Sequence, residues 1–502
     1  MTLTPRGPDS PKGGWTAWLS FGVLALVMAA WTHLRSSKVP DVDILYHLAH
    51  SRAMWTEGIF MREFPWATAS VIGDVGADIW WGFHVFLMPV SWMKPGPLQI
   101  QLAGILVLFT SLMLLYGSMR VVRCPLPWLW PILLLWSSSS VNWRMTMIRP
   151  QVISLACLAL LLAYGLNRNA KGVFWASLGF AFIHQTASWM VLPLVVLFFG
   201  LLRVWEPTFR GRELVATLTG LVLPWILRSD PVGAIQVMKV QIVDLYRVKA
   251  SDVKLNFGTE LAAYPPSGFF SSLGLVLGFG FIVLLLWFVR KADDRASKGH
   301  VIAVFGVTAI LMFATIFVTR RALDPAMAAL AVTLGLASIG STVQEQRWIS
   351  GIAVALMILT GISSQRLLDQ QGVNPMRLQA LSAELKQQVP KGEVITHIWW
   401  PMFADLMYHS PEHRFIGGMD PIFQYVHSPQ KWNALRDLPV DQDPGKTLAE
   451  KFSSRTLVLI KSHSPDFLRR LNTTSGVTKL YEDSDYVVFQ FPAKNLTQSS
   501  RN

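Results

Sequence analysis

The sequence predicts an α-helical membrane protein with many transmembrane helices, followed by a C-terminal soluble α/β domain. Of the 502 residues, 52% are hydrophobic and only 15% are charged, and the mean hydropathy is +0.38. A soluble domain carries about a quarter charged residues. Apolar runs long enough to cross about 30 Å of hydrocarbon recur through residues 15–364, and none follows.

Eleven apolar runs are predicted membrane spans. The first follows a polar leader, residues 1–14, and is too long for a signal-peptide core and lacks a clear cleavage site, so we interpret it as a retained helix. A further run, 79–93, is short and contains His84 and Pro89. The eleven runs are 15–34, 98–119, 125–142, 151–166, 173–188, 189–203, 213–228, 270–289, 301–318, 325–342 and 348–364.

The basic residues predict the orientation of these spans. If the N-terminus is cytoplasmic and 79–93 does not cross, the inner sections hold 14 Lys and Arg, whereas the short outer loops hold only Arg144, Arg149, Arg320 and Arg321. Cytoplasmic loops are enriched in Lys and Arg. The segment 79–93 is therefore predicted to be a juxtamembrane or re-entrant helix. We expect a multi-pass protein of the cell inner membrane.

This orientation places three long parts of the chain on the outer side. They are the loops 35–97 and 229–269 and the C-terminal domain, residues 365–502, which is expected to be periplasmic or extracellular. Within this domain, spacing and alternation predict helices at 375–389, 420–438 and 465–471 and strands at 393–398, 455–461 and 485–491.

The formal net charge of +13 does not indicate a nucleic-acid partner. Residues 365–502 hold 16 Lys and Arg against 14 Asp and Glu, so the excess lies mainly in the short membrane loops. The two cysteines, Cys124 and Cys157, cannot build a disulfide framework or a cysteine metal site.

The first outer loop contains the residues most suited to chemistry. A helix starting at Pro40 would place Asp43, His47 and His50 on one face. A carboxylate there can accept a proton, and Asp41 and Asp43 together could hold a divalent ion. The alternative is structural: Asp41 caps the helix, Asp43 favours the helix dipole, and the histidines are satisfied interfacial groups.

Four segments carry a family resemblance: DVDILYHLAHSRAMWTEGIF, ADIWWGFHVFLMPV, MIRPQVISLACLALLL and HSPEHRFIGGMDPIFQY. They are similar to segments of a bacterial branch of predicted GT-C proteins. The GT-C superfamily comprises membrane glycosyltransferases that use polyprenyl-phosphate-linked sugars. It includes oligosaccharyltransferase catalytic subunits, protein mannosyltransferases and lipid A aminoarabinose transferases. The resemblance implies a GT-C like membrane module followed by an outer α/β domain.

The resemblance also implies roles for individual residues. Asp41 or Asp43 would be the first-loop catalytic carboxylate, acting as base toward the acceptor or helping to bind Mg²⁺ or Mn²⁺. The sugar would pass with inversion to a glycan, lipid or protein acceptor. Arg144 and Arg149 would contact the phosphate of the donor, unless they only snorkel at helix ends. The further substrate-binding candidates are His47, Asp78, His84, Arg247, Trp399 and Trp400.

The tryptophan pair departs from the family pattern. Oligosaccharyltransferase subunits carry a Trp-Trp-Asp that recognises the acceptor sequon, whereas this chain has Trp399-Trp400-Pro401. Acceptor recognition of that kind is therefore not expected. The pair could stack on a sugar or pack the outer domain onto the membrane.

The sequence favours a glycosyltransferase that moves a sugar from a polyprenyl-phosphate-linked donor at the outer face of the membrane. The alternative is a non-catalytic or transporter-like membrane protein that handles lipid-linked glycans. Transporters typically show paired repeats and ionisable residues near the midplane. This sequence shows no repeat, and its charges gather at the span ends.

Overall fold

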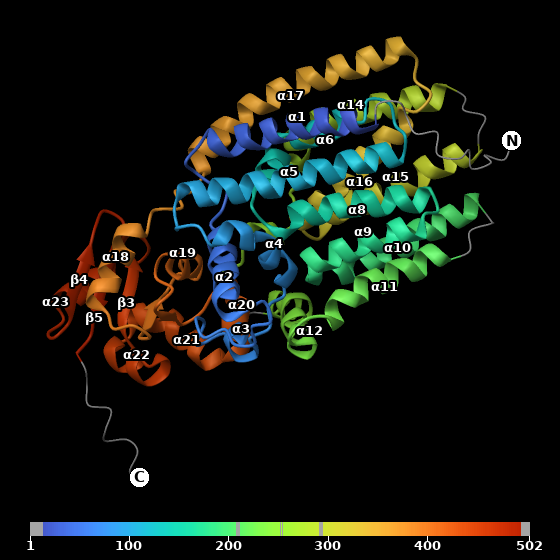
Figure 1. The fold of residues 1–502 in the computed structure, drawn as a ribbon. Coiled ribbons are helices and arrows are strands. Elements are labelled where there is room, and N and C mark those ends of the chain that lie inside the picture. Colours follow the sequence, from blue (N-terminus) through green and yellow to red (C-terminus); the bar gives the residue numbers. More distant parts are fainter. Residues whose placement is uncertain (1–13, 207–210, 252, 254, 291–294, 493–502) are drawn as a thin grey trace.

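The computed structural model describes residues 14–206, 211–251, 253, 255–290 and 295–492. Residues 1–13 of the predicted leader lie outside the described residues. Long helices run side by side as a bundle, and a sheet lies beyond one end of it (Figure 1). At that end, α2 runs across the direction of the long helices.

The described residues contain six helices that are long and apolar enough to cross a membrane. A seventh is obtained if the bent pair α7 (Ser139–Thr146) and α8 (Pro150–Leu166) counts as one span. The chain is therefore a multi-pass membrane protein, and the predicted total of eleven spans stays a prediction. The six are α1 (Gly14–Leu34), α5 (Pro97–Val121), α10 (Gln185–Trp205), α14 (Pro266–Val289), α15 (Arg295–Phe317) and α17 (Val343–Gln371).

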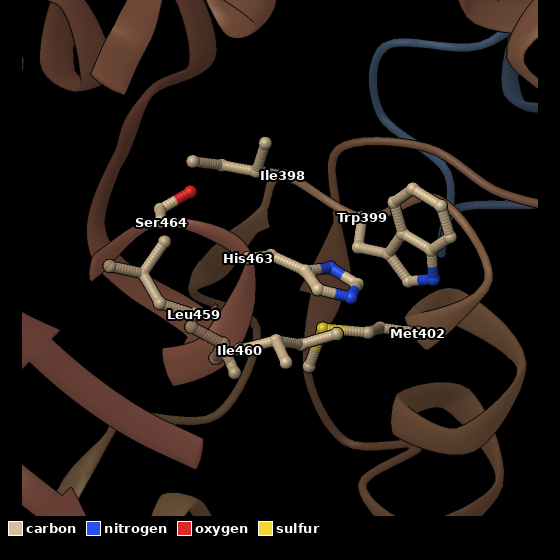
Figure 2. A pocket seen from close by; sticks show the side chains of 8 residues that line it. Ile398, Trp399, Met402, Leu459, Ile460, His463 and Ser464 are labelled. Atoms are coloured by element: carbon tan, nitrogen blue, oxygen red, sulfur yellow. The ribbon is translucent and has the colours of Figure 1, made fainter. Parts of the chain in front are cut away.

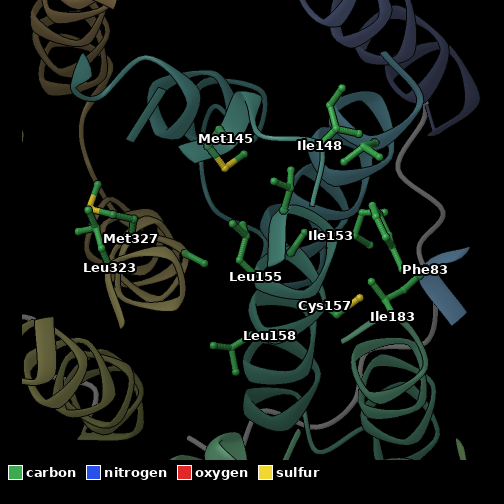
Figure 3. Close-up of a cluster of buried hydrophobic side chains, with 14 of the residues drawn as sticks. Phe83, Met145, Ile148, Ile153, Leu155, Cys157, Leu158, Ile183, Leu323 and Met327 are labelled. Atoms are coloured by element: carbon green, nitrogen blue, oxygen red, sulfur yellow. The ribbon is translucent and has the colours of Figure 1, made fainter. Parts of the chain in front are cut away.

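Three other predicted spans correspond to shorter helices: α9 (Ala170–Ile183), α11 (Arg212–Ile226) and α16 (Leu323–Ala337). The boundary between α9 and α10 lies at His184, whose backbone is not helical, and not after residue 188 as predicted. α8 packs between its neighbours: Figure 3 shows Phe83 and Ile183 on one side of it and Leu323 and Met327 on the other.

The prediction of one continuous helix over 125–142 is wrong. The segment contains α6 (Leu129–Leu135), which ends at Trp136, and the start of α7. Ser138 has an extended backbone, and its hydroxyl accepts the N–H of Val141. Such a cap starts a new helix, and it outweighs the apolar character of the segment.

The first outer loop folds into three short helices: α2 (Asp43–Glu57), α3 (Val71–Val75) and α4 (Trp81–Ser91). α2 begins at Asp43 and not at Pro40, and the Asp41 carboxylate accepts the backbone N–H of Asp43 at 2.6 Å. The 11 residues of α4 span about 17 Å at 1.5 Å per residue. This length agrees with the prediction that 79–93 does not cross.

The C-terminal sheet region contains five strands in the order β2-β1-β3-β5-β4. β1 is parallel to β2 and β3, whereas β5 is antiparallel to β3 and β4. The three predicted strands agree with β1, β3 and β5, and the predicted helix 420–438 is divided into α20 and α21. The strands are β1 (Val394–His397), β2 (Arg414–Phe415), β3 (Ser454–Ile460), β4 (Thr478–Glu482) and β5 (Tyr486–Gln490). The helices are α18 (Gln379–Gln388), α19 (Met402–His409), α20 (Pro421–His427), α21 (Pro429–Asp437), α22 (Pro444–Phe452) and α23 (Pro465–Thr473).

Backbone hydrogen bonds attach this sheet region to the first outer loop. The N–H of Phe415 in β2 donates to Trp66, and Thr68 donates back to the carbonyl of Phe415, each at 2.8 Å. Val39 and Val373 form a second, antiparallel bridge. The region is therefore held against the loop that contains Asp41 and Asp43.

One buried tyrosine fastens the sheet region to the membrane bundle. The Tyr408 hydroxyl in α19 donates to Gln99 of α5 at 2.7 Å and accepts the N–H of Gly96 at 2.9 Å. The Arg52 guanidinium lies 5.4 Å from the centre of the tyrosine ring. All three contacts come from outside the sheet region.

Replacing this hydroxyl should loosen the attachment. Tyr408→Phe removes one of the two donors to the buried Gln99 Oε1, which keeps Arg52, and it takes the acceptor from the N–H of the half-buried Gly96, so we expect a loss of about 1–2 kcal/mol of unfolding free energy. Thermal unfolding of the full chain in detergent measures the loss. Tyr246→Phe, on a ring that is 37% exposed, should stay within about 0.5 kcal/mol of wild type. Equal effects of the two changes would contradict the proposed role of Tyr408.

Candidate functional site

Arg149 binds three carboxylates, two from the start of the loop 35–97 and one from the loop 229–269. Its Nε lies 2.9 Å from Asp41 Oδ2, its Nη2 lies 2.7 Å from Asp43 Oδ2, and its Nη1 lies 2.7 Å from Glu260 Oε2. Arg321 also pairs with Glu260, through Nε at 3.1 Å and through Nη2. We call these five residues the Arg149 cluster. The structure thus brings together three of the predicted site residues, Asp41, Asp43 and Arg149.

Local backbone constraints place Arg149 at the centre of this cluster. Arg149 precedes Pro150 and has an extended backbone, the conformation that a following proline favours. The chain bends by 107° between α7 and α8 at this point. Asp43 is the first residue of α2, and Glu260 lies in a short 3-10 turn, Thr259–Leu261. The three positions therefore lie at helix starts or in a short turn.

The carboxylates of the cluster differ in their proton affinity. Burial raises the pKa of Asp43 to about 7, and the charges of Asp41 and Glu260 add to this effect while Arg149 opposes it. Burial would also raise the pKa of Glu260, but Arg149 and Arg321 outweigh it and hold that pKa below its ordinary value. Two acids with separated pKa values at one site are typical of acid–base chemistry.

The sheet region contributes a further carboxylate that the sequence did not single out. Asp420 caps α20 by accepting the N–H of Ile422 at 3.1 Å. Burial raises the pKa of Asp420 to about 6, and the charges of Arg321 and Glu260 act on it. Asp420 therefore lies near the Arg149 cluster. In the sequence, Asp420 could be recognised only as a helix cap, because the Asp-Pro pair within HRFIGGMDPIFQY is a typical start of a helix.

The arrangement of Asp41 and Asp43 does not fit the predicted Mg²⁺ or Mn²⁺. These ions need several oxygen ligands at about 2.1 Å in near-octahedral geometry. Here the guanidinium of Arg149 lies against one oxygen of each carboxylate and supplies the positive charge. We therefore derive no step through an ion at these two residues.

The predicted phosphate ligand Arg144 has a separate partner. It forms a bidentate ion pair with Asp324, with Nη2 2.6 Å from Oδ2. The side chains of Arg144 and Asp324 are 11% and 6% exposed. Arg144 therefore forms an internal ion pair that joins α7 to α16. Arg247 lies elsewhere: its side chain is 72% exposed and pairs with Asp244.

His47, Asp78 and His84 lie together with His50 in a second, buried group, which we call the histidine cluster. Asp78 Oδ2 lies 2.6 Å from His84 Nδ1 and 3.6 Å from His50 Nε2. His84 Nε2 lies 2.8 Å from His47 Nδ1. Burial lowers the pKa of His50 to about 3 and also lowers that of His47. Among the described residues, His50, Asp78 and His84 are the set whose ligand atoms approach closely enough to hold a metal ion.

The two predicted tryptophans have different surroundings. Trp400 donates its Nε1–H to the carbonyl of Asn256 at 3.1 Å, which joins the sheet region to the loop 229–269. Trp399 packs edge-on against His463 at 4.9 Å. Trp399 and His463 line a cavity of about 330 Å³ together with Ile398, Met402 and others (Figure 2).

The fold is similar to that of solved membrane glycosyltransferases, although no family model and no curated protein matches the sequence. ArnT from Cupriavidus metallidurans in the apo state has a TM-score of 0.55 at 14% identity, over 95% of this chain and 98% of ArnT. ArnT bound to undecaprenyl phosphate gives the same TM-score and identity over 96% and 99%. Oligosaccharyltransferase AglB from Archaeoglobus fulgidus, with an inhibitory peptide and a dolichol-phosphate, has a TM-score of 0.57 at 12% identity over 92% and 71%.

These likenesses confirm the predicted GT-C fold, whereas the number of about eleven spans and the soluble state of the C-terminal domain stay predictions. The identities are low, so the likeness concerns the fold alone.

Removing Arg149 should leave three carboxylates without their shared partner. We expect Arg149→Met to lower the unfolding free energy by about 3–5 kcal/mol at neutral pH. The depressed pKa of Glu260 stabilises the wild type above the ordinary pKa of a glutamate, and this contribution is lost as the pH falls. The deficit of the variant should therefore shrink in acid, where its carboxylates are protonated.

Unfolding by denaturant at neutral and acidic pH measures this difference. Arg247→Met is the matched control, because the exposed Arg247 pairs only at the surface, and it should stay within about 0.5 kcal/mol of wild type. A deficit for Arg149→Met that is the same at both pH values would contradict the interpretation.

Proposed function

We propose that the chain is a glycosyltransferase that moves a sugar from a polyprenyl-phosphate-linked donor to an acceptor at the outer face of the membrane. The observation that carries the proposal is the Arg149 cluster, where the start of α2, the residue before α8 and the Glu260 turn meet. There Asp43 combines a pKa of about 7 with partial exposure of 25%. The GT-C fold supports the same class of reaction.

Asp43 is the proposed general base. A base is most effective when its pKa lies near the working pH. Its carboxylate accepts the proton of the acceptor hydroxyl or amine as that atom attacks the anomeric carbon. The bond between the sugar and the carrier phosphate breaks in the same displacement, which inverts the anomeric centre. Asp41 accepts the backbone N–H of Asp43 and binds Arg149, and it positions the base.

The leaving phosphate requires positive charge. Arg149 and Arg144 are already paired within the protein, so we assign this contact to Arg320 and Arg321. Arg321 is 44% exposed while it pairs with Glu260. Arg320 lies over the Tyr264 ring at 4.9 Å, and its buried Nε has no hydrogen-bond partner in the described part of the chain. Guanidinium groups are well suited to bind phosphate oxygens.

The structural neighbours support the carrier lipid and the location. ArnT was solved with undecaprenyl phosphate and AglB with a dolichol-phosphate. The proposal therefore includes a polyprenyl phosphate as the leaving group, with a glycan, lipid or protein as acceptor. It also includes an inner-membrane location, with a cytoplasmic N-terminus and the sheet region outside.

Substitution of the base tests the mechanism. Asp43→Asn should lower transfer by about 10²–10⁴-fold, because an amide cannot take the proton. Asp41→Asn should have a smaller effect. Release of polyprenyl phosphate from a panel of polyprenyl-phosphate-linked sugars, with the protein in proteoliposomes, measures the rate.

Asp74→Asn is the matched control, because Asp74 lies in the same outer loop and pairs with His427 at the surface. It should transfer sugar at the wild-type rate. Full activity of Asp43→Asn would sink the proposed mechanism.

The pH dependence tests the same residue independently. The base must be ionised, so kcat/KM should rise with pH through about 7 and then level off. The charge of Arg321 lowers the pKa of Asp43, so Arg321→Gln should move this rise to higher pH. A rise that moves to lower pH, or an activity that is flat from pH 5 to 8, is incompatible with Asp43 as base.

A further inference from the structure

The histidine cluster has the ligand set of a metal site. His50 Nε2 and His84 Nδ1 both face one oxygen of Asp78, at 3.6 and 2.6 Å, and the three ligand atoms lie within 4.8 Å of one another. Two imidazoles and a carboxylate are a common set for Zn²⁺ and related divalent ions. Small side-chain shifts would bring all three to the usual bond lengths of about 2.0–2.2 Å.

The outer nitrogen of each of these histidines already has a partner. His50 Nδ1 lies 3.0 Å from the Tyr46 hydroxyl, and His84 Nε2 lies 2.8 Å from His47 Nδ1. A ligating histidine normally donates its second N–H in this way, which fixes the ring and leaves the inner nitrogen as a lone-pair donor. His50 Nε2 is buried and has no hydrogen-bond partner among the described residues.

A bound cation would also stabilise the buried negative charge of Asp78. Its side chain is 7% exposed, and its Oδ1 accepts the N–H of Trp80 at 2.9 Å. Arg228 is close enough for its charge to interact with that of Asp78. In the described residues, however, no ion pair joins these two side chains, and Arg228 Nη1 lacks a hydrogen-bond partner. A buried carboxylate without a full ion pair is costly.

We infer that His50, Asp78 and His84 bind one divalent transition-metal ion, with Zn²⁺ as the best match, at a site separate from the Arg149 cluster. The ion joins α2 to α4 and to the segment that precedes it. His50 follows Asp43 by seven residues, which is two helical turns. The metal therefore fixes the helix that begins at Asp43, and its role is to position that helix.

Metal analysis of the full-length protein tests this site. The protein is purified without metal-affinity resin, stripped with chelator, reloaded with Zn²⁺ and analysed by mass spectrometry. We expect one Zn²⁺ per chain. His50→Gln, Asp78→Asn and His84→Gln should each weaken Zn²⁺ binding by more than about 100-fold, and Tyr46→Phe, which removes only an outer partner, by about 10–100-fold.

Two controls separate this site from other carboxylates. Asp74→Asn removes the exposed partner of His427, and Asp43→Asn alters the Arg149 cluster, and both should keep the metal. Loss of transfer with metal retained in Asp43→Asn distinguishes the two proposals. Wild-type protein that binds no Zn²⁺, or ligand variants that bind it as tightly as wild type, would overturn the inference.

A spectroscopic measurement covers the case in which the ligand variants do not fold. Wild-type protein loaded with Co²⁺ should show the absorption of a low-coordinate site, and X-ray absorption should show two imidazole ligands. A spectrum of hydrated Co²⁺, or one without imidazole scattering, would overturn the inference on the wild-type chain alone.

Discussion

One guanidinium shared by three carboxylates joins the loops 35–97 and 229–269 to the break between α7 and α8. Arg149 lies at the break between α7 and α8 and binds Asp41, Asp43 and Glu260, which come from the first outer loop and from the loop 229–269. Its five N–H donors form a planar fork, which a lysine could not reproduce. Removing it would leave Asp41 and Asp43 without their guanidinium and Glu260 with Arg321 alone, so one side chain links the bend, the start of α2 and the Glu260 turn.

The same interaction separates the chemistry of neighbouring acids. Glu260 has two guanidinium partners and remains ionised, whereas burial and its negative neighbours bring the pKa of Asp43 to about 7. Asp420 reaches this environment from the sheet region, which is attached to the bundle through Tyr408 and to the loop 35–97 through Phe415. The fold thus places a carboxylate with a raised pKa beside one with a lowered pKa.

Properties local to the sequence predicted much of the fold. Long apolar runs predicted α1, α5, α14 and α17 because a run of about 20 apolar residues, which is visible in the sequence, is enough to cross a bilayer. The run 125–142 was misassigned because the single cap at Ser138 outweighs average hydropathy. Strands β1 and β3 were predicted from short apolar runs and β5 from its alternation, whereas the short β2 has only two residues and offered no pattern.

The candidate site was predictable only in part. The predicted orientation put Asp41, Asp43 and Arg149 on one side of the membrane, and the structure pairs Arg149 with both aspartates, whereas their predicted roles stay predictions. Their partners Glu260, Arg321 and Asp420 come from distant segments that tertiary packing brings together, and one sequence carries no local signal for such contacts. Likewise the spacing of His47 and His50 was visible, but the position of Asp78 between His50 and His84 was not.

A structure with a bound polyprenyl phosphate tests the central claim most directly. We expect the phosphate to contact Arg320 or Arg321. The Asp43 carboxylate should then face the side of the sugar opposite the phosphate, from which the acceptor attacks. A phosphate bound away from the Arg149 cluster, with Asp43 remote from it, would contradict the account.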